Sequence, residues 1–252
     1  RVFQLKAHQI PEADRTAKGL PIINLIGLDQ GETVTAVLAA PDFEADYLLM
    51  ATRQGEIKKT PLGEFAVVRS NGLIAMDLEP GDELAWVKHC PKGCELVLVT
   101  ERGQAIRFKE SDVPERSRQA GGVRGVRLAA GDRVCALEVV EPDAQLLVVT
   151  ANGYGKRTPL TEYPVQGRGG QGVRTTTVTE KTGPVAAARD VHGHEELMVI
   201  SANGTVLRTT VASIARSGRP AQGVQVMGLR GGDRVACISL LNGHDENGAS
   251  DR

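Results

Sequence analysis

Residues 145–163 read QLLVVTANGYGKRTPLTEY, and this stretch contains the pattern that decides the fold. An apolar run, Leu146–Val149, leads into Asn152 and Gly153, a pair that accepts positive φ and suits a tight type I′ turn. A second extended segment follows the turn. The stretch therefore predicts a β-hairpin.

The same hairpin occurs three more times in the chain. It reads YLLMATRQGEIKKTPLGEF at 47–65, ELVLVTERGQAIRFKESDV at 95–113 and ELMVISANGTVLRTTVASI at 196–214. The turn glycines are Gly55, Gly103, Gly153 and Gly204, spaced 48, 50 and 51 residues apart. A period of this size indicates a repeat architecture. The opening RVFQLKAHQI aligns with the outgoing strand of the hairpin, with Arg1 at the position of Glu56, so we expect a truncated first repeat.

Each hairpin is followed by a polar, basic loop that ends in a glycine, and then by a short apolar run that we expect to form a strand. The closing glycines are Gly19, Gly72, Gly122, Gly172 and Gly223, and the runs after them are LPIINL, LIAMDL, VRGVRL, VRTTTV and VQVMGL. A second turn and another apolar run, such as Val34–Leu38 or Val134–Val140, complete each unit. Four strands in each of several repeats predict the blades of a propeller-like disc.

The repeats predict one all-β domain over residues 1–241, followed by a polar tail, 242–252. The approximate repeat boundaries are 1–46, 47–94, 95–144, 145–195 and 196–241. The composition agrees, because 252 residues with 41% hydrophobic content can bury a substantial core. Glycine is frequent, at 29 residues, and no dozen residues free of Gly and Pro carry apolar side chains at helical spacing.

The sequence contains no apolar stretch of 18 residues and no signal peptide. We therefore expect a cytoplasmic domain with no membrane partner, monomeric when isolated. The four cysteines, Cys90, Cys94, Cys135 and Cys237, do not form a disulfide framework in a chain of this length, and we expect them to be reduced.

The distribution of charge is more informative than its sum. The formal net charge is −1, from 30 basic and 31 acidic residues, so bulk charge predicts no polyanionic partner. Four of five repeats nevertheless carry Lys or Arg four positions after the turn glycine, while many acids lie beside the second turns. One interpretation is that strand-edge cations provide solubility. Their recurrence at one offset instead predicts a continuous basic rim, to which cations at neighbouring strand positions and in the basic loops contribute. The predicted rim residues are Arg15, Lys18, Lys58, Lys59, Arg69, Arg107, Lys109, Arg116, Arg118, Lys156, Arg157, Arg168, Arg174, Arg208, Arg216 and Arg219.

Such a rim suits double-stranded DNA. The chain has only four Phe, three Tyr and one Trp, too few for the stacking that single strands require. No recognition helix is evident for reading a major groove. Phosphate contact remains, and its affinity should fall steeply with salt, with a slope of about −0.9 per neutralised phosphate. Bending the duplex around the rim would cost on the order of several kcal/mol per 20 to 30 base pairs.

Four segments resemble the carboxy-terminal domain of the bacterial DNA gyrase A subunit. They are HQIPEADRTAKGLPIINLIGL at 8–28, FKESDVPERSRQAGGVRGVRL at 108–128, NGYGKRTPLTEYP at 152–164 and ANGTVLRTTVASI at 202–214. The resemblance spans essentially the whole chain. It implies a six-bladed β-pinwheel of four-stranded blades with hairpins exchanged between neighbours, whose first blade is truncated here and whose basic perimeter wraps duplex DNA.

The resemblance also implies a role within a larger enzyme. The domain itself would hold no catalytic residue and no cofactor, while ATP and Mg²⁺ would act elsewhere in an assembly of two A and two B gyrase subunits that introduces negative supercoils. The family's gyrase-A box, Q-R-R-G-G-K-G, would lie upstream of Arg1. Residues 166–172, QGRGGQG, resemble it in a later repeat, where we interpret them as an inter-blade loop that faces DNA through Arg168.

Other interpretations stay open at this point. The equivalent domain of the topoisomerase IV A subunit, a propeller used for protein interactions and a propeller hydrolase are the alternatives. Cys90 and Cys94 beside His89 lack the second ligand pair of a structural zinc site. His192 and His194 are clustered in one repeat, and the G-x-G-x-x-G match at 167–172 precedes a predicted strand instead of a helix. We therefore predict no metal, nucleotide or catalytic site.

Overall fold

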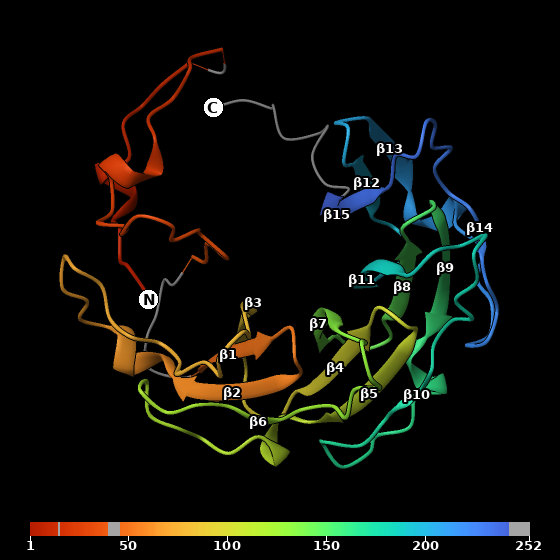
Figure 1. Cartoon of the computed structure of the whole chain (residues 1–252), viewed down its shortest axis with the longest axis horizontal. Coiled ribbons are helices and arrows are strands. Elements are labelled where there is room, and N and C mark those ends of the chain that lie inside the picture. Colours follow the sequence, from red (N-terminus) through yellow and green to blue (C-terminus); the bar gives the residue numbers. More distant parts are fainter. Residues whose placement is uncertain (15, 40–45, 242–252) are drawn as a thin grey trace, which may run out of the picture. The chain divides into compact units, whose positions relative to one another are not determined.

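The computed structural model describes residues 1–14, 16–39 and 46–241 (Figure 1). Over these residues the regular structure consists of strands and short 3-10 helices, which confirms the predicted all-β class. The chain divides into two compact units. Arg1–Thr52, Glu56–Lys92 and Val113–Val123 form the first, and Arg53–Gly55, Gly93–Asp112 and the chain from Arg124 form the second. The predicted single domain over 1–241 stays a prediction, and the predicted tail 242–252 lies outside the described residues.

Three four-stranded sheets and one three-stranded sheet contain all the named strands of the described residues. The first sheet has the order β3-β1-β2-β6, from Leu84–Cys90, Tyr47–Thr52, Glu56–Pro61 and Val123–Arg124. The second, β10-β5-β4-β7, contains Val173–Arg174, Gln104–Lys109, Glu95–Thr100 and Val134–Val140. The third, β11-β8-β9-β14, contains Val185–Val191, Gln145–Thr150, Tyr154–Pro159 and Val224–Gln225. The fourth, β13-β12-β15, contains Val206–Thr210, Glu196–Ser201 and Val235–Leu241.

Strand exchange links consecutive repeats. In each four-stranded sheet, three strands come from one repeat and the short fourth strand comes from the next repeat along the chain. Thus β10 pairs with β5 through Val173 opposite Ala105, and β14 pairs with β9 through Val224 opposite Gly155. The exchange between neighbouring blades that the resemblance implies is confirmed. The described residues form four sheets, fewer than the five visible repeats and the six blades expected.

The first repeat contributes no sheet within the described residues. Its regular elements are two 3-10 helices, η1 (Ala7–Gln9) and η2 (Ile22–Asn24), and the run Val34–Leu38 is not a strand. Val2 nevertheless forms an antiparallel bridge with Leu73. This bridge matches the pairs that join β10 to β5 and β14 to β9, so it supports the predicted alignment of the opening residues with an outgoing strand.

The strands found after the closing glycines, β6, β10 and β14, are shorter than the predicted apolar runs, and one turn prediction is wrong. The apolar runs after the closing glycines pair over two residues at most, because the next amides turn away from the ladder: Thr175 N donates to Gly103 O and Val226 N to Gly153 O, both at 2.8 Å. The hairpin at 145–163 also lacks a type I′ turn. Gly153 has φ of 83°, but Asp143 is the only non-glycine residue with positive φ in the described chain. Gly153 N donates to Thr150 O at 2.9 Å, which closes a three-residue loop.

Four more 3-10 helices complete the repeats. One follows each hairpin, and they are η3 (Leu62–Phe65), η4 (Glu110–Asp112), η5 (Leu160–Glu162) and η6 (Val211–Ser213). Each turns the chain from the outgoing strand into the basic loop. The basic loops considered below are residues 115–122, 165–172 and 215–223.

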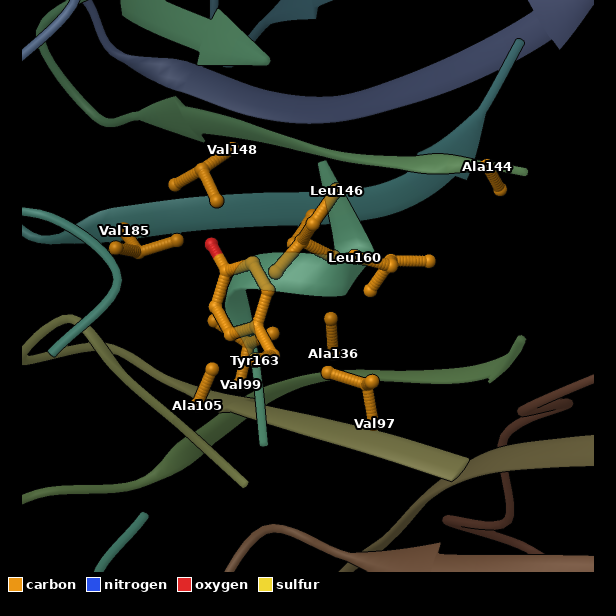
Figure 2. Packing of buried hydrophobic residues seen from close by; sticks show 11 residues of the cluster. Val97, Val99, Ala105, Ala136, Ala144, Leu146, Val148, Leu160, Tyr163 and Val185 are labelled. Carbon is orange, nitrogen blue, oxygen red and sulfur yellow. The ribbon is translucent and has the colours of Figure 1, made fainter. Parts of the chain in front are cut away.

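The core of the second unit lies between its sheets. Leu146 and Val148 of β8 pack with side chains of β4, β5 and β7 around Tyr163, as Figure 2 shows. Leu147 and Val149 point to the other face of β8 and pack with side chains of β12 and β15. Because both faces are buried, β8 reads as a continuous apolar run and not as an alternating one. The Tyr163 hydroxyl lies 2.5 Å from Thr175 Oγ1, which satisfies both buried hydroxyl groups.

Candidate nucleic-acid interface

The predicted rim cations differ widely in exposure. The exposed ones are Lys18, Arg69, Lys109, Arg116, Arg174, Arg208 and Arg216. Those that are half-buried are Arg107, Arg118, Arg157, Arg168 and Arg219, and those that are buried are Lys58, Lys59 and Lys156. Arg15 lies outside the described residues. The repeat offset alone therefore did not separate surface cations from interior ones.

Lys58 and Lys156 are interior residues. They stand three positions after their turn glycines, and they are 0% and 1% exposed. The Lys58 ammonium donates to backbone carbonyl oxygens, among them Ala75 O and Arg118 O, both at 2.7 Å. Burial lowers the pKa of each lysine from 10.5 to about 8. The expected surface position of these two side chains is incorrect, because a loop of the next repeat covers them.

Two of the cations four positions after the turn glycine, Arg107 and Arg157, connect consecutive repeats. Arg107 Nε donates to Glu95 Oε2 of its own hairpin at 2.6 Å, while its Nη1 donates to Leu160 O of η5 at 2.6 Å. Arg157 likewise donates from Nε to Ile214 O at 2.8 Å and from Nη2 to Ala212 O of η6 at 3.1 Å. Because these guanidinium groups already bind the next repeat, they have fewer donors left for an external anion.

The cation at this position differs in each remaining repeat. Lys59 Nζ lies 4.6 Å from the centroid of the Tyr47 ring, a cation–π distance. Arg208 forms an ion pair with Glu196 and keeps two thirds of its side chain, 66%, exposed. Of the cations four positions after a turn glycine, Arg208 is therefore the one that an external anion reaches most easily.

The basic loops carry the cations that best fit a surface site. Each loop runs beside the outgoing strand of the preceding repeat, through parallel bridges that join Lys59 to Glu115, Arg107 to Val165 and Arg157 to Arg216. In four of the five repeats an arginine stands four residues before the closing glycine: Arg15, Arg118, Arg168 and Arg219. All four are among the predicted rim residues.

Two arginines from consecutive repeats meet at a shallow cleft in the second unit. The cleft has a volume of about 420 Å³ and is lined by Gln104, Arg174, Arg219 and Pro220, with no carboxylate among these residues. Arg174 belongs to the exchanged strand β10, and Arg219 belongs to the basic loop of the following repeat. Two guanidinium groups at one cleft form a favourable place for a phosphate oxygen.

Arg124 was not among the predicted rim residues. It is exposed and stands two residues after a closing glycine, at the same offset as the predicted Arg174. The Arg168 side chain lies against it and donates from Nη1 to Arg124 O at 3.1 Å and from Nε to Asp112 O at 2.7 Å. Applying the Arg174 offset to the preceding repeat would have found it.

The acidic residues at the second turns are bound to the backbone. Asp132 Oδ1 accepts from Arg102 N at 3.0 Å and from Arg133 N at 2.8 Å. Asp233 Oδ1 accepts from Asn203 N and Arg234 N, and the pKa of Asp233 is lowered by hydrogen bonds, the largest effect coming from Ser201. Their recurrence therefore follows from turn geometry.

The histidine and cysteine clusters do not form a metal centre. Among the described residues no group of three or more His, Cys, Asp or Glu side chains is placed to hold a metal ion. His192 Nε2 lies 3.1 Å from Glu141 Oε2, and its ring stacks on that of His194 at 5.7 Å between centroids. Both histidines therefore have contacts of their own. No helix among the described residues is long and apolar enough to span a membrane.

Four-stranded sheets that exchange strands along the chain, with an arginine at one place in successive loops, define a propeller-type repeat protein. The family model of the DNA gyrase C-terminal domain, a β-propeller, matches residues 1–41, 46–91, 95–141, 144–191 and 195–239. The chain belongs to this family. Its five matched segments agree with the five repeats seen in the sequence.

Relatives agree with this assignment. The chain is 40% identical to the DNA gyrase A subunit of Staphylococcus epidermidis over 251 residues, which cover 98% of this chain and 28% of that protein. It is 43% identical to the DNA gyrase A subunit of Dehalogenimonas lykanthroporepellens over 249 residues, 96% of this chain and 31% of that protein. The chain thus spans less than a third of the length of these relatives.

Two solved structures share the fold. A structure of the DNA gyrase A C-terminal domain has a TM-score of 0.81 at 27% identity, covering 89% of this chain and 75% of that chain. A crystal structure of the C-terminal domain of DNA topoisomerase IV has a TM-score of 0.87 at 26% identity, covering 95% and 75%. Both matches extend over most of the repeats described above.

Proposed function

We propose that this chain is the duplex-DNA-binding and wrapping domain of a DNA gyrase A subunit. The observation that carries the proposal is the arginine repeated in successive basic loops, which in the second unit joins Arg174 at a cleft without a lining carboxylate. Phosphate contacts of this kind bind DNA with little dependence on sequence. The scarcity of aromatic residues, 3% of the chain, is consistent with a duplex partner.

The proposed context is the whole gyrase. Two A subunits and two gyrase B subunits would form an A2B2 assembly in the bacterial cytoplasm, where wrapped DNA is presented for ATP-dependent negative supercoiling. In this proposal the catalytic residues, ATP and Mg²⁺ belong to other parts of the assembly, and this domain binds no cofactor. The equivalent role in topoisomerase IV is not better supported, because the matched family model and the two relatives described above are those of gyrase.

The first test compares two variants with the same loss of charge. In the loop variant, four arginines of the candidate interface are each replaced by Gln: Arg116, Arg174, Arg216 and Arg219. In the control variant, four exposed cations outside the basic loops are each replaced by Gln: Lys92, Arg102, Lys181 and Arg230. Affinity for a duplex is measured at several salt concentrations.

We expect the loop variant to lose affinity and the slope of log affinity against log salt to become shallower by about 3 to 4, at about 0.9 per phosphate contact. The control should change much less. Equal losses in the two variants would show that only the bulk charge matters. Absence of salt-dependent binding by the unmodified chain would favour a protein-interaction domain instead.

Wrapping is tested separately from binding. Fluorescent labels at the two ends of a duplex of about 150 base pairs, one persistence length, report whether the ends approach when the chain binds. Energy transfer that rises with bound protein and falls with salt supports bending by this domain. Binding without approach of the ends would leave the chain as a docking surface and refute wrapping by these residues.

A further inference from the structure

Two buried lysines occupy equivalent positions in alternate repeats. Lys58 in β2 and Lys156 in β9 each stand three residues after the turn glycine, and neither side chain reaches the surface. A buried ammonium is costly unless hydrogen bonds replace its water. Each lysine therefore needs hydrogen-bond acceptors nearby, and these come from the main chain.

The acceptors belong largely to the basic loop of the next repeat. Lys58 Nζ donates to Arg118 O at 2.7 Å, Ala120 O at 2.8 Å and Ala75 O at 2.7 Å, which uses all three of its protons. Lys156 Nζ donates to Gly218 O at 2.7 Å and Arg219 O at 2.5 Å. In both loops the carbonyl of the recurring arginine is thus bonded to the lysine beneath it.

A threonine near each lysine also binds the loop. Thr60 Oγ1 donates to Arg116 O at 2.8 Å, and Thr158 Oγ1 donates to Ser217 O at 2.9 Å. The threonines follow the lysines by two residues, so both side chains of each pair leave the strand on the same face. Lysine and threonine together bind the inner side of the loop main chain.

A glutamate also binds the main chain of each of these two loops. Glu64 Oε2 accepts from Arg118 N at 3.2 Å, and Glu162 Oε2 accepts from Arg219 N at 3.3 Å. The main chain at Arg118 and at Arg219 therefore has its carbonyl bonded to a lysine and its amide bonded to a glutamate. The backbone at this point is fixed from both sides.

Two other repeats have an apolar residue in place of the lysine. Ile106 and Leu207 stand at the same offset, and neither side chain can donate a hydrogen bond. Over Ile106, the loop arginine itself makes the connection, because the Arg168 side chain binds Asp112 O and Arg124 O. Over Lys156, the Arg219 side chain instead lines the cleft with Arg174. Over Lys58, Arg118 Nε forms an ion pair with Glu64 Oε2 at 3.5 Å and, among the described residues, makes no hydrogen bond of the Arg168 kind to carbonyl groups of the preceding repeat.

We propose that Lys58 and Lys156 are positioning residues that hold the basic loops 115–122 and 215–223 from beneath, so that the loop main chain is already ordered when arginines of these loops bind DNA phosphates. The inference rests on the proposed function for the identity of the ligand. It assigns these two lysines no contact with DNA. Their charge acts on the carbonyl groups of the loop.

Amine labelling of the unmodified chain gives the first test and requires no variant. Lys58 and Lys156 should react with an acylating reagent much more slowly than the exposed Lys92 and Lys181, whether or not duplex DNA is present. Fast labelling of the two lysines in the free chain, with protection by DNA, would overturn the proposal, since it would mean that they contact DNA directly.

The second test replaces Lys58 by Met, with Lys92→Met as the control for lost charge. Hydrogen exchange in residues 115–121 should accelerate in K58M and not in K92M, while exchange in 165–171, where no lysine holds the loop, should stay unchanged. The dissociation constant for a duplex should rise about tenfold, because two arginine side chains must then be ordered on binding. Unchanged loop exchange in folded K58M would overturn the proposal.

A double-mutant cycle separates positioning from direct contact. If Lys58 acts through Arg118, then K58M should weaken binding markedly less in an R118A background than in the unmodified chain. Additive losses would indicate independent contacts and refute the proposal. If the unmodified chain binds no duplex, the proposed function fails, whereas labelling and exchange still decide whether the lysines hold the loops.

Discussion

Replacing Gly172 by Ala tests the junction between consecutive repeats. Gly172 has φ of 72°, and a Cβ atom there would lie 2.7 Å from the carbonyl carbon of Ala105 and 3.0 Å from Ile106 N, with Ala105 O closer still. These are backbone atoms of β5, so no side-chain rotation relieves the overlap. The exchanged strand β10, which begins one residue later, would have to move away from β5.

Gly232 provides a matched control. Its φ is 77°, and a Cβ atom there meets nothing within 4 Å. G232A should therefore cost only the left-handed backbone conformation, about 1 to 2 kcal/mol. G172A adds the lost pairing of the two residues of β10, at about 1 kcal/mol for each backbone hydrogen bond, and some apolar exposure. A total of about 3 to 5 kcal/mol follows from these contributions.

The assay is thermal unfolding followed by circular dichroism. At about 2 to 4 °C per kcal/mol for domains of this size, G172A should lower Tm by roughly 6 to 20 °C and G232A by roughly 2 to 8 °C. DNA affinity of folded G172A should also fall, because Arg174 lies in β10. Equal destabilisation by the two substitutions would refute the argument that close approach of β10 to β5 requires glycine at 172.

Three further predictions concern single groups. Burial lowers the pKa of Lys58 and Lys156 to about 8, so the unfolded chain binds more protons than the folded chain between pH 8 and 10.5. The free energy of unfolding should therefore rise with pH across this window, relative to that of a K58M/K156M variant. The charged groups that act on these lysines are Glu64, Asp77 and Arg116 for Lys58, and Glu162 and Arg219 for Lys156. Denaturant titrations at several pH values measure the difference, and equal pH profiles would contradict it. Replacing Tyr163 by Phe should cost about 1 to 2 kcal/mol in a denaturant titration, since the hydroxyl of buried Thr175 loses its partner, and a neutral result would contradict that bond. Replacing Arg107 by Lys should accelerate hydrogen exchange in residues 160–163, because an ammonium cannot reproduce a planar fork that binds both Glu95 and Leu160 O, and unchanged exchange would contradict this role.

The candidate site was only partly predictable. Loop arginines such as Arg116 and Arg216, and Arg174 of β10, were predicted and are exposed. Lys58 and Lys156 were predicted with them on the basis of a shared offset, yet they are buried. An offset from a turn fixes a residue's place and side along a strand. It does not show whether that side faces solvent or is covered by a loop of the next repeat. The loop residues that bind Lys58 and Lys156, among them Arg118 and Gly218, lie some 60 residues further along the chain.

The sequence by itself determined the hairpins, the repeat and the all-β class, because turn residues and the two-residue period of a strand act over short distances. The continuous apolar run of β8 was likewise readable, although only the packing of Leu146 and Leu147 on opposite neighbours explains it. Tertiary structure alone decided the source of each fourth strand and the burial of Lys58 and Lys156, since both depend on contacts between consecutive repeats. Those contacts are set by how the sheets pack and where the exchanged strand lies, and neither is encoded in the local pattern of any single repeat.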